Sequence, residues 1–229
     1  MKNAVSVVTA LYNDSHTAIA AIASLEKHLA REFTNWEIVI IDDASADGSE
    51  VLVRKYIRHK PRIRLFVHQA NQGIAKTYQE LYRRATGDVI VLFSVDGEWD
   101  ASDTVLLAKT LIEKKLDMVI GVRRQKQYSA ERALISRLYN IVTVLLFGVS
   151  TKDAGSIKAM KKSLVSSIPI ISLGVFDEAE RIIRASKQGS RIGFVDVHHR
   201  ATRKKHRGIR MNHVWRAIID AARVLTDIN

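Results

Sequence analysis

The 229-residue sequence has no cysteine and only two prolines. Without cysteine, the chain cannot form disulfides, Cys-ligated zinc sites, iron–sulfur clusters or a thiol nucleophile. Its longest mainly apolar stretch, residues 141–149, is far shorter than the roughly 18 residues that a membrane-spanning helix needs. The N-terminus lacks the pattern of a secretory signal as well. The sequence therefore predicts an ordered globular protein without a membrane-spanning segment.

Several motifs with defined chemistry are also missing. The sequence has neither Gly-x-Gly-x-x-Gly nor a Walker-type Gly-Lys-Ser/Thr element, which argues against a dinucleotide oxidoreductase or a P-loop NTPase. It has no Gly-x-Ser-x-Gly elbow, and its histidines do not have metalloprotease spacing. His198, His199, His206 and His213 have no neighbouring acid or cysteine to complete a zinc site, so a solvated basic surface is the preferred interpretation.

Acidic residues are the minority among the charges. The chain has 36 lysines and arginines against 24 aspartates and glutamates, a net charge of +12. Seven of the basic residues and no acid lie between His198 and Arg216. Such a surplus points to a polyanionic partner, which includes nucleic acid, an anionic membrane surface and phosphorylated substrates. Because aromatics are only 7% of the residues and do not alternate with the basic run, a nucleic-acid partner is not expected.

Short β-rich apolar runs alternate with amphipathic helical patterns in the first half of the chain. The five expected strands are residues 5–9, 37–42, 62–67, 88–94 and 117–121. The expected helices between them are residues 15–30, 49–59, 74–85 and 102–114, with Ser15, Ser49 and Ser102 as available N-caps. This alternation is typical of an α/β, Rossmann-like domain with a mostly parallel central sheet flanked by helices.

The second half continues the domain with less regular alternation. The expected elements are a long apolar helix at 130–147, a strand at 155–160, a helix at 177–187, a strand at 191–198 and a last helix from Asn212. In that last helix, Trp215, Ile218, Ile219, Ala222 and Leu225 follow one another at helical spacing and give it one apolar face. No linker interrupts the chain, so we expect one domain over residues 1–210, followed by an amphipathic helix and tail at 211–229.

Polar clusters follow the first four expected strands. They are residues 12–14, 42–49, 71–73 and 94–98. In open α/β sheets, ligands bind outside the carboxyl ends of the strands. Asp42 and Asp43 have two possible roles. They could simply end a strand before a turn and a helix cap, or their carboxylates could accept hydrogen bonds from a nucleotide base or ribose. Asp96 and Glu98 are two residues apart, so an extended conformation would point both carboxylates to one side, where they could hold a hard divalent cation.

Motifs along most of the chain resemble one known family. Val7–Asp14 is similar to Val-Ile-Pro-Ala-Tyr-Asn-Glu, and Ile40–Ser49 to Val-Asp-Asp-Gly-Ser-Thr-Asp-Gly-Ser. Asn71-Gln72-Gly73 and Ala85-Thr86-Gly87-Asp88 match Asn-x-Gly and Ala-x-Gly-Asp. Residues 5–208 thereby resemble the inverting glycosyltransferases of family 2 with the GT-A fold, especially the polyprenyl-phosphate (dolichyl-phosphate) mannose or glucose synthases.

Later motifs extend the resemblance, with departures. Ser94-Val95-Asp96-Gly97-Glu98 stands where the family usually has Asp-Ala-Asp-Gly-Gln, so the first Asp is replaced and Glu takes the place of Gln. Gly121-Val122-Arg123 resembles Gly-Ser-Arg, and Ser136 with Asn140 fits Ser-x-x-x-Asn. Residues 153–158 and 180–185 resemble Asp-x-x-Ser-Gly-Phe-Arg/Lys and Glu-Leu-Leu-x-x-Ala. The basic loop that follows His199 resembles Arg-x-x-Gly-x-Ser-Lys. When Gly208 is aligned with the Gly of that motif, Lys205 stands at its Arg.

The resemblance implies a nucleotide-binding half at about residues 1–122 and an acceptor-binding half at about 123–210. The implied nucleotide contacts are Ala10, Tyr12, Asp14, Asp42, Asp43, Asn71, Arg203 and Lys205. The implied metal ligands for Mg²⁺ or Mn²⁺ are Asp96 and Glu98, and the implied acceptor contacts are Arg123, Ser136, Asn140 and Lys158. Asp96 and Arg123 would be the catalytic residues.

The expected reaction is inverting transfer of mannose or glucose from a GDP- or UDP-linked sugar to a polyprenyl or dolichyl phosphate. The basic loop and the last helix would hold the protein peripherally at the anionic cytoplasmic face of a membrane. A separate membrane-anchoring subunit is the alternative. Two other functions stay open: a family-2 enzyme acting on a soluble or cell-wall saccharide, and, as the weakest, a nucleic-acid-binding protein.

Overall fold

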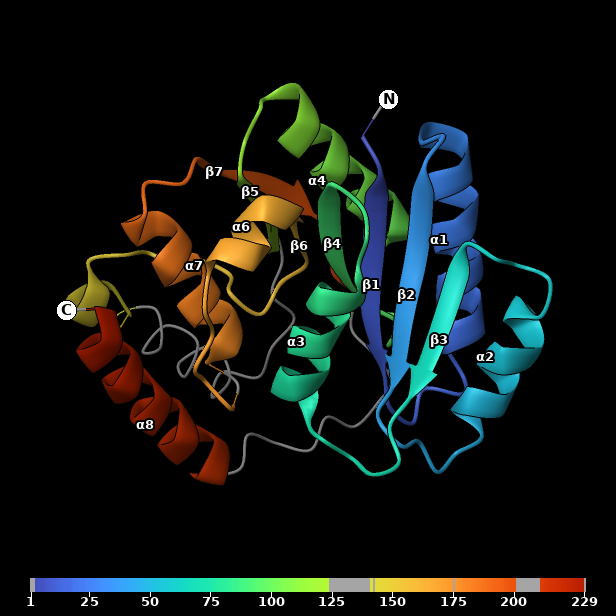
Figure 1. The fold of residues 1–229 in the computed structure, drawn as a ribbon, viewed down its shortest axis with the longest axis horizontal. Helices are drawn as coiled ribbons and strands as arrows, with labels where there is room; N and C mark the ends of the chain where they lie inside the picture. Colours follow the sequence, from blue (N-terminus) through green and yellow to red (C-terminus); the bar gives the residue numbers. More distant parts are fainter. Residues whose placement is uncertain (1–2, 124–140, 142, 175, 201–210, 229) are drawn as a thin grey trace.

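The computed structural model describes residues 3–123, 141, 143–174, 176–200 and 211–228. Within them, a seven-stranded sheet has the strand order β3-β2-β1-β4-β6-β5-β7 (Figure 1). The strands are β1 (Val5–Leu11), β2 (Trp36–Asp42), β3 (Ile63–Val67), β4 (Val89–Ser94), β5 (Met118–Arg123), β6 (Lys158–Lys161) and β7 (Ile192–Val197). β6 runs antiparallel to both of its neighbours, and the other pairs are parallel. The predicted mostly parallel sheet is confirmed.

Helices cover both faces of the sheet (Figure 1). They are α1 (Ala18–Glu32), α2 (Ser49–Ile57), α3 (Ile74–Arg84), α4 (Ala101–Glu113), α6 (Lys162–Ser167), α7 (Asp177–Lys187) and α8 (Met211–Ile228). α1, α2 and α4 share one apolar core with the sheet, while α3, α6, α7 and α8 share the other. The short α6 is not evident from the sequence. Of the expected helix at 130–147, residues 141 and 143–147 are helical, while 130–140 and 142 lie outside the described residues.

The central strands supply apolar side chains to both cores. In β1, Val7 packs in the core of α1, α2 and α4, and Val8 packs in the core on the opposite face. This alternation follows from the two-residue period of a strand. Because helices cover both faces, β1, β2 and β4 read as nearly continuous apolar runs. The apolar runs in the sequence therefore place the centre of the sheet correctly.

The starts of three helices differ from the expected N-caps. Asp100 caps α4, because its Oδ1 accepts a hydrogen bond from the Ser102 amide at 3.0 Å. α1 begins after Thr17 rather than after Ser15. α2 begins at Ser49 itself, and the Ser49 Oγ accepts a hydrogen bond from the Asp14 amide at 3.0 Å. The Ser49 hydroxyl thus joins two loops instead of capping its own helix.

The last helix, α8, has apolar residues on two sides. Ala221 and Val224 are buried in the core beside α7. Trp215, Ile218 and Ile219 are instead 60%, 53% and 48% exposed. The single apolar face expected from the sequence therefore divides into a packed side and an outer side. Among the described residues, no helix combines the length and the apolar character needed to cross a membrane.

Candidate active site

The polar clusters meet at one edge of the sheet, where β1, β2 and β4 end. Ala10 pairs with Ile41 of β2 and with Ser94 of β4, so the loops that follow these strands begin side by side. The β2 and β3 arrowheads mark this edge in Figure 1. The strand order changes direction at β1 and β4, which is where open α/β sheets place their ligands. Tyr12, just beyond β1, is 46% exposed at this edge.

Short polar side chains join the loops after β1 and β2. The Asn13 amide donates a hydrogen bond to the Ser45 Oγ at 2.9 Å, and the Asn13 Oδ1 accepts one from the Ala46 amide at 2.8 Å. The bond from the Asp14 amide to the Ser49 Oγ adds a third connection. These bonds give otherwise unpaired loop amides a partner. The two loops thus form one connected wall of the site.

Asp42 lies at the end of β2 with no exposed surface. Its Oδ1 accepts a hydrogen bond from the Ser45 amide at 2.7 Å, whereas its buried Oδ2 has no hydrogen-bond partner among the described residues. Burial raises the pKa of Asp42, and the negative charges of Glu50 and Asp47 raise it further. A buried acceptor without a donor is costly. The Oδ2 is therefore suited to take a hydrogen bond from a ligand.

The neighbouring Asp43 carboxylate is already used within the protein. Its Oδ1 accepts from the Gln72 amide and lies 2.7 Å from the His68 Nδ1, and its Oδ2 accepts from the Gly73 amide at 3.0 Å. The Asn71 Nδ2 donates to the Asp43 carbonyl at 3.2 Å. Asp43 therefore fixes the loop between β3 and α3 at the carboxyl edge of the sheet.

A turn, not an extended segment, follows β4. Gly97 has a φ of +83°, a left-handed conformation that favours glycine. The Asp96 Oδ1 accepts a hydrogen bond from the Glu98 amide at 3.0 Å, and the Glu98 Oε2 lies 3.3 Å from the His199 Nε2. The extended conformation expected to align the two carboxylates is wrong. Glu98 contacts His199, and Asp96 closes the turn.

The electrostatic surroundings of Asp96 favour a cation. Burial raises the pKa of Asp96, and the negative charges of Glu98 and Asp14 act in the same direction. Within the described residues, no group of three or more His, Asp or Glu side chains could hold a metal ion. Mg²⁺, however, commonly binds through one or two carboxylates together with substrate phosphates. Asp96 fits a metal held jointly with a nucleotide diphosphate.

Arg123 ends β5 beside this turn. The Asp153 carboxylate accepts hydrogen bonds from the Arg123 Nε at 2.8 Å and from its Nη2, and also from the Arg123 amide at 3.1 Å. The guanidinium carbon lies 5.5 Å from the centre of the Trp99 ring. A fork-to-fork pair fixes the plane of a guanidinium. Asp153 and Trp99 therefore hold a cationic group next to the turn that carries Asp96.

The end of β7 is also attached to this turn. Trp99 and His199 form an isolated β-bridge, and their rings meet edge to face at 5.1 Å. The Arg200 amide donates to the Glu98 carbonyl at 2.8 Å. The His199 side chain is only 4% exposed, so the solvated position expected for it is wrong, whereas His198 is 77% exposed. Trp99 has little sequence signal beyond an aromatic residue directly after the 94–98 cluster.

Lys158 lies in a different environment from the one expected of an acceptor contact. Its side chain has no exposed surface, and its Nζ donates to the Ala154 carbonyl at 2.8 Å and to the Glu178 Oε2 at 2.6 Å. The Tyr82 hydroxyl donates to Glu178 at 3.0 Å. Burial opposes ionisation of Glu178, but Lys158 and then Arg181 hold the pKa of Glu178 below its usual value. Lys158 thus neutralises a buried carboxylate.

Four expected site residues lie outside the described residues. They are Ser136, Asn140, Arg203 and Lys205. The described residues bring together Ala10, Tyr12, Asp14, Asp42, Asp43, Asn71, Asp96, Glu98 and Arg123 around the carboxyl edge. The sequence motifs alone do not reveal the fixed partners of Arg123 and Asp43, since these partners come from distant segments.

Curated relatives of the chain include two enzymes with lipid-linked names. The dodecaprenyl-phosphate galacturonate synthase of Rhizobium johnstonii is 25% identical over 227 residues, which cover 96% of this chain and 66% of the relative. An Escherichia coli UDP-Glc:alpha-D-GlcNAc-diphosphoundecaprenol beta-1,3-glucosyltransferase is 26% identical over 117 residues, covering 51% of this chain and 44% of the relative. The chain thus spans less than two thirds of the length of these relatives.

Among solved structures, the glucosyl-3-phosphoglycerate synthase of Mycobacterium tuberculosis in complex with Mn²⁺, UDP and phosphoglyceric acid has a TM-score of 0.76 at 16% identity. The match covers 99% of this chain and 78% of the other. This likeness confirms the α/β fold expected from the resemblance to GT-A enzymes. The sequence model of Glycosyl transferase family 2 matches residues 6–166, which is more than half of the chain, and the protein therefore belongs to that family.

Proposed function

We propose that the protein transfers a hexose, mannose or glucose, from a GDP- or UDP-linked sugar to a polyprenyl phosphate of the dolichyl or undecaprenyl type, with inversion at the anomeric carbon. The observation that carries this proposal is the contact between Arg123 and Trp99, because it sets a phosphate-binding cation beside the turn of Asp96. The Rhizobium relative is named a dodecaprenyl-phosphate galacturonate synthase, and this name supports the acceptor class.

The acceptor phosphate requires little activation. A phosphate oxygen of the acceptor is already an anion at neutral pH, and it attacks the anomeric carbon directly. The bond between the anomeric carbon and the diphosphate oxygen of the donor breaks, and the nucleoside diphosphate leaves. Catalysis can then rest on positioning of the two substrates and on stabilisation of charge. Arg123 binds the acceptor phosphate, and its pair with Asp153 keeps the planar guanidinium oriented for that contact. Ser136 and Asn140 are proposed as further acceptor contacts.

The donor nucleotide occupies the wall formed by the loops after β1, β2 and β3. Asp42 supplies an acceptor for a base or ribose donor through its Oδ2, which lacks a partner among the described residues. Asp43 acts by holding the adjacent loop and Asn71 in place. Ala10, Tyr12 and Asp14 line the end of β1, and Arg203 and Lys205 are proposed to meet the diphosphate.

A divalent cation, Mg²⁺ or Mn²⁺, is proposed to accompany the diphosphate. Asp96 would hold it, with Glu98 as the candidate second carboxylate. When bound, such an ion neutralises the charge that develops on the departing diphosphate. The phosphoglycerate synthase that shares the fold was crystallised with Mn²⁺ and also with Mg²⁺, which supports this assignment.

Peripheral attachment at the cytoplasmic face of a membrane would bring the site to a lipid acceptor. The outer side of α8 supplies Trp215, Ile218 and Ile219, and the basic stretch before it supplies positive charge. Neutralising Arg203, Lys204 and Lys205 together should weaken binding to anionic vesicles by about 1 kcal/mol per charge, and salt should shrink the difference. Unchanged vesicle binding would argue for a membrane-anchoring subunit instead.

The acceptor experiment uses a radiolabelled nucleotide sugar with Mn²⁺. Transfer to a short-chain, water-soluble isoprenyl phosphate should exceed transfer to the matching isoprenyl alcohol or to a free saccharide. Arg123→Lys should lower transfer to the phosphate while leaving nucleotide affinity unchanged, since a lysine keeps the charge but loses the two-pronged pair with Asp153 that orients it. Equal transfer to the alcohol would contradict a phosphate acceptor.

A second candidate function, transfer to a saccharide hydroxyl, is favoured by one observation. Such an acceptor requires a general base. Burial, followed by the negative charge of Glu178, raises the pKa of Asp177 to about 7, and its buried Oδ2 has no hydrogen-bond partner among the described residues. Asp177→Asn should abolish transfer to a saccharide but spare transfer to a phosphate. The variant thereby separates the two functions.

A further inference from the structure

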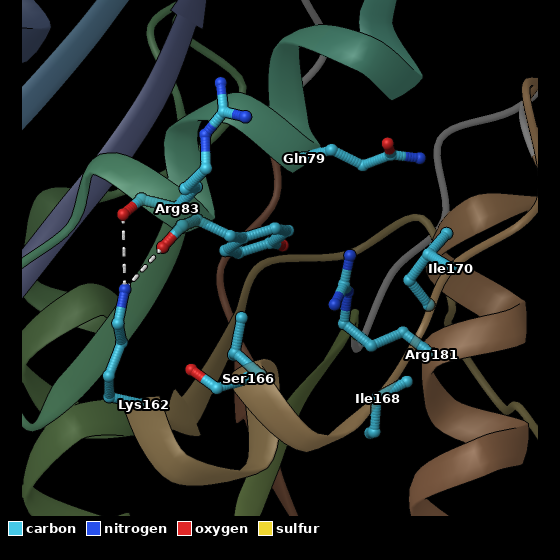
Figure 2. A pocket seen from close by; sticks show the side chains of 9 residues that line it. Gln79, Arg83, Lys162, Ser166, Ile168, Ile170 and Arg181 are labelled. Carbon is cyan, nitrogen blue, oxygen red and sulfur yellow. Dashed lines mark hydrogen bonds between the residues drawn. The ribbon is translucent and has the colours of Figure 1, made fainter.

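A cavity of about 370 Å³ opens between α3, α6 and α7 (Figure 2). Its walls include Tyr82, Arg83, Lys162, Ser166, Ile170 and Arg181. The Lys162 amide donates to the carbonyl of Asp88, directly before β4, so this part of the cavity lies at the amino edge of the sheet. The candidate active site lies at the carboxyl edge. This end of the cavity is therefore remote from the candidate active site, whereas Arg181 and Tyr82 at its other end contact Glu178, the partner of Lys158.

Arg181 is the unusual member of this wall. Its side chain is 3% exposed, yet its Nε has no hydrogen-bond partner among the described residues. Its nearest carboxylate oxygen is the Glu178 Oε1 at 3.5 Å, and its guanidinium carbon lies 4.3 Å from the centre of the Tyr82 ring. A buried charge with one long ionic contact is costly. A bound anion would supply the missing partner.

Arg181 interacts with two acids, Glu178 and Asp177, and burial raises the pKa of Asp177, which opposes its ionisation. Glu178 makes its shorter contact with Lys158, at 2.6 Å. Lys162 adds further positive charge, although its Nζ already donates to the carbonyls of Tyr82 and Ala85 at 2.9 and 2.7 Å. This wall of the cavity thus carries a net positive charge. Lys162 therefore contributes positive charge to the cavity, but its Nζ already uses most of its hydrogen-bond donors on backbone carbonyls.

Two exposed side chains complete a set of donors around the opening. Ser166 and Arg83 make no side-chain hydrogen bond or ion pair with the part of the chain that the structure describes. In Figure 2, Arg181 reaches from α7 toward the space between Ser166 and α3, while the Arg83 guanidinium points away from it. Because Arg83 is exposed, its long side chain can turn toward a ligand. Val165, Ile168 and Ile170 provide an apolar wall beside these donors.

We propose that this cavity binds a phosphate group, free or carried by a small organic molecule, with Arg181 as its buried ligand and Arg83 and Ser166 as surface ligands. Arginine is suited to this task because its planar fork donates two parallel hydrogen bonds to an oxyanion. The volume exceeds what a lone phosphate needs, and the apolar wall accommodates the carbon skeleton of a phosphate ester. The site is independent of the transferase reaction proposed above.

The test measures phosphate binding with the nucleotide site occupied. The full chain is held with Mn²⁺ in excess UDP or in excess GDP, and its melting temperature and calorimetric heat are followed as inorganic phosphate replaces chloride at constant ionic strength. Phosphate should raise the melting temperature, since a ligand of the folded state stabilises it. Loss of the effect in either nucleotide would place the anion in the donor site and overturn the proposal.

Three variants assign the binding to this cavity. Arg83→Ala should weaken phosphate binding about tenfold, the loss expected for one charge-assisted hydrogen bond. Arg181→Lys and Ser166→Glu should weaken it further, the first by removing the fork and the second by placing a carboxylate at the opening. Arg58→Ala, which changes an exposed arginine after α2, is the matched control and should bind as the wild type does. Equal affinity in all four variants would refute the site.

Three ligands separate the sources of the phosphate group. Binding of inorganic phosphate and glycerol 3-phosphate that Ser166→Glu weakens, together with vesicle binding that Ser166→Glu leaves unchanged, would identify a soluble ligand. Binding of the vesicles that is lost in Ser166→Glu would identify a lipid headgroup. If none of the three binds, or if Ser166→Glu binds all of them unchanged, the cavity is not a phosphate site. Because Ser166 is exposed, this substitution leaves the core intact.

Discussion

The loops after β1 and β2 are joined by hydrogen bonds from backbone amides to short polar side chains, whereas ion pairs join the segments around β5 and β6. At the loops after β1 and β2, which we call the donor side or donor wall after the proposed function, Ser45 and Ser49 accept from the amides of Asn13 and Asp14. Around β5 and β6, which we call the acceptor side after the proposed function, the contacts are Arg123 with Asp153 and Lys158 with Glu178, and all four side chains are 8% exposed or less.

The difference decides how each side responds to substitution. A neutral hydrogen bond contributes about 0.5–1.5 kcal/mol, and loop amides that lose a partner can turn to water. Removing one member of a buried ion pair leaves an uncompensated charge and costs about 3–5 kcal/mol. The donor wall is therefore tolerant and locally adjustable. The acceptor side depends on charges that must be replaced together.

The largest effect is expected for the acceptor side. Lys158→Met should lower the free energy of unfolding by about 3–5 kcal/mol, because Glu178 loses its cation. Lys161→Met, three residues along the same strand, removes a pair with Asp117 whose lysine is 36% exposed, and should cost about 1 kcal/mol or less. Urea unfolding measures both. Similar losses would contradict the larger cost assigned to a buried ion pair than to an exposed one.

Asp96→Ala tests the turn after β4, which lies between the donor wall and the acceptor side. Turnover should fall roughly 100-fold or more with the fold intact, because a diphosphate-bound metal would lose its main carboxylate. Circular dichroism checks the fold, and initial rates at saturating donor check the chemical step. Near-normal turnover in the folded variant would remove Asp96 from the metal site.

Within the donor wall, the alanine variants of Asp42 and Asp43 should differ in their effect on stability. Both alanine variants should weaken nucleotide-sugar binding more than they alter the chemical step. Asp43→Ala should also lower stability by about 1–3 kcal/mol, since the Gln72 and Gly73 amides lose their acceptor. Calorimetry with UDP and GDP, together with urea unfolding, separates the effects. Unchanged affinity in both variants would rule out a nucleotide site at β2.

The smallest effect concerns pH on the donor side. Burial opposes protonation of His68, but its hydrogen bonds to Asp43 and Glu80 raise the pKa of His68 above its usual value. The stability that His68 contributes is therefore full below the unfolded-state pKa, about 6.5, and is lost as pH rises through the higher folded-state value. His68→Asn should destabilise the protein more at pH 6 than at pH 9. The opposite order would contradict a protonated His68 in the fold.

The sequence predicts the sheet and its loop clusters because both follow from local pattern. Apolar runs mark the strands, and parallel strands bring their carboxyl ends to one edge, so Asp42 and Asp96 could be placed together in advance. The turn at Gly97 was harder to foresee, because Asp-Gly-Glu fits both an extended and a turned backbone.

Burial of charge could not be predicted from local pattern. Lys158 looks like a surface cation until Glu178, on a later helix, is brought against it. Asp153 likewise fits a simple cap, yet it fixes Arg123 from 30 residues away. Such pairs form between segments that are far apart in the sequence, so the pattern of a single sequence does not show which residues will meet. For the same reason, the burial of Arg181 could not be predicted from the sequence of α7, which contains several charged residues.

The reversed direction of β6 constrains the order in which the chain assembles. β6 lies between β4 and β5 and pairs with both, although it follows them in the sequence. During synthesis, β1 to β4 can form their parallel pairs first, but β5 and β7 can join the sheet only after residues 158–161 emerge. Until then β4 presents an unpaired apolar edge, which is the kind of edge that promotes aggregation. The parallel part of the sheet, β1 to β4, can therefore form before β5, β6 and β7 are added to it.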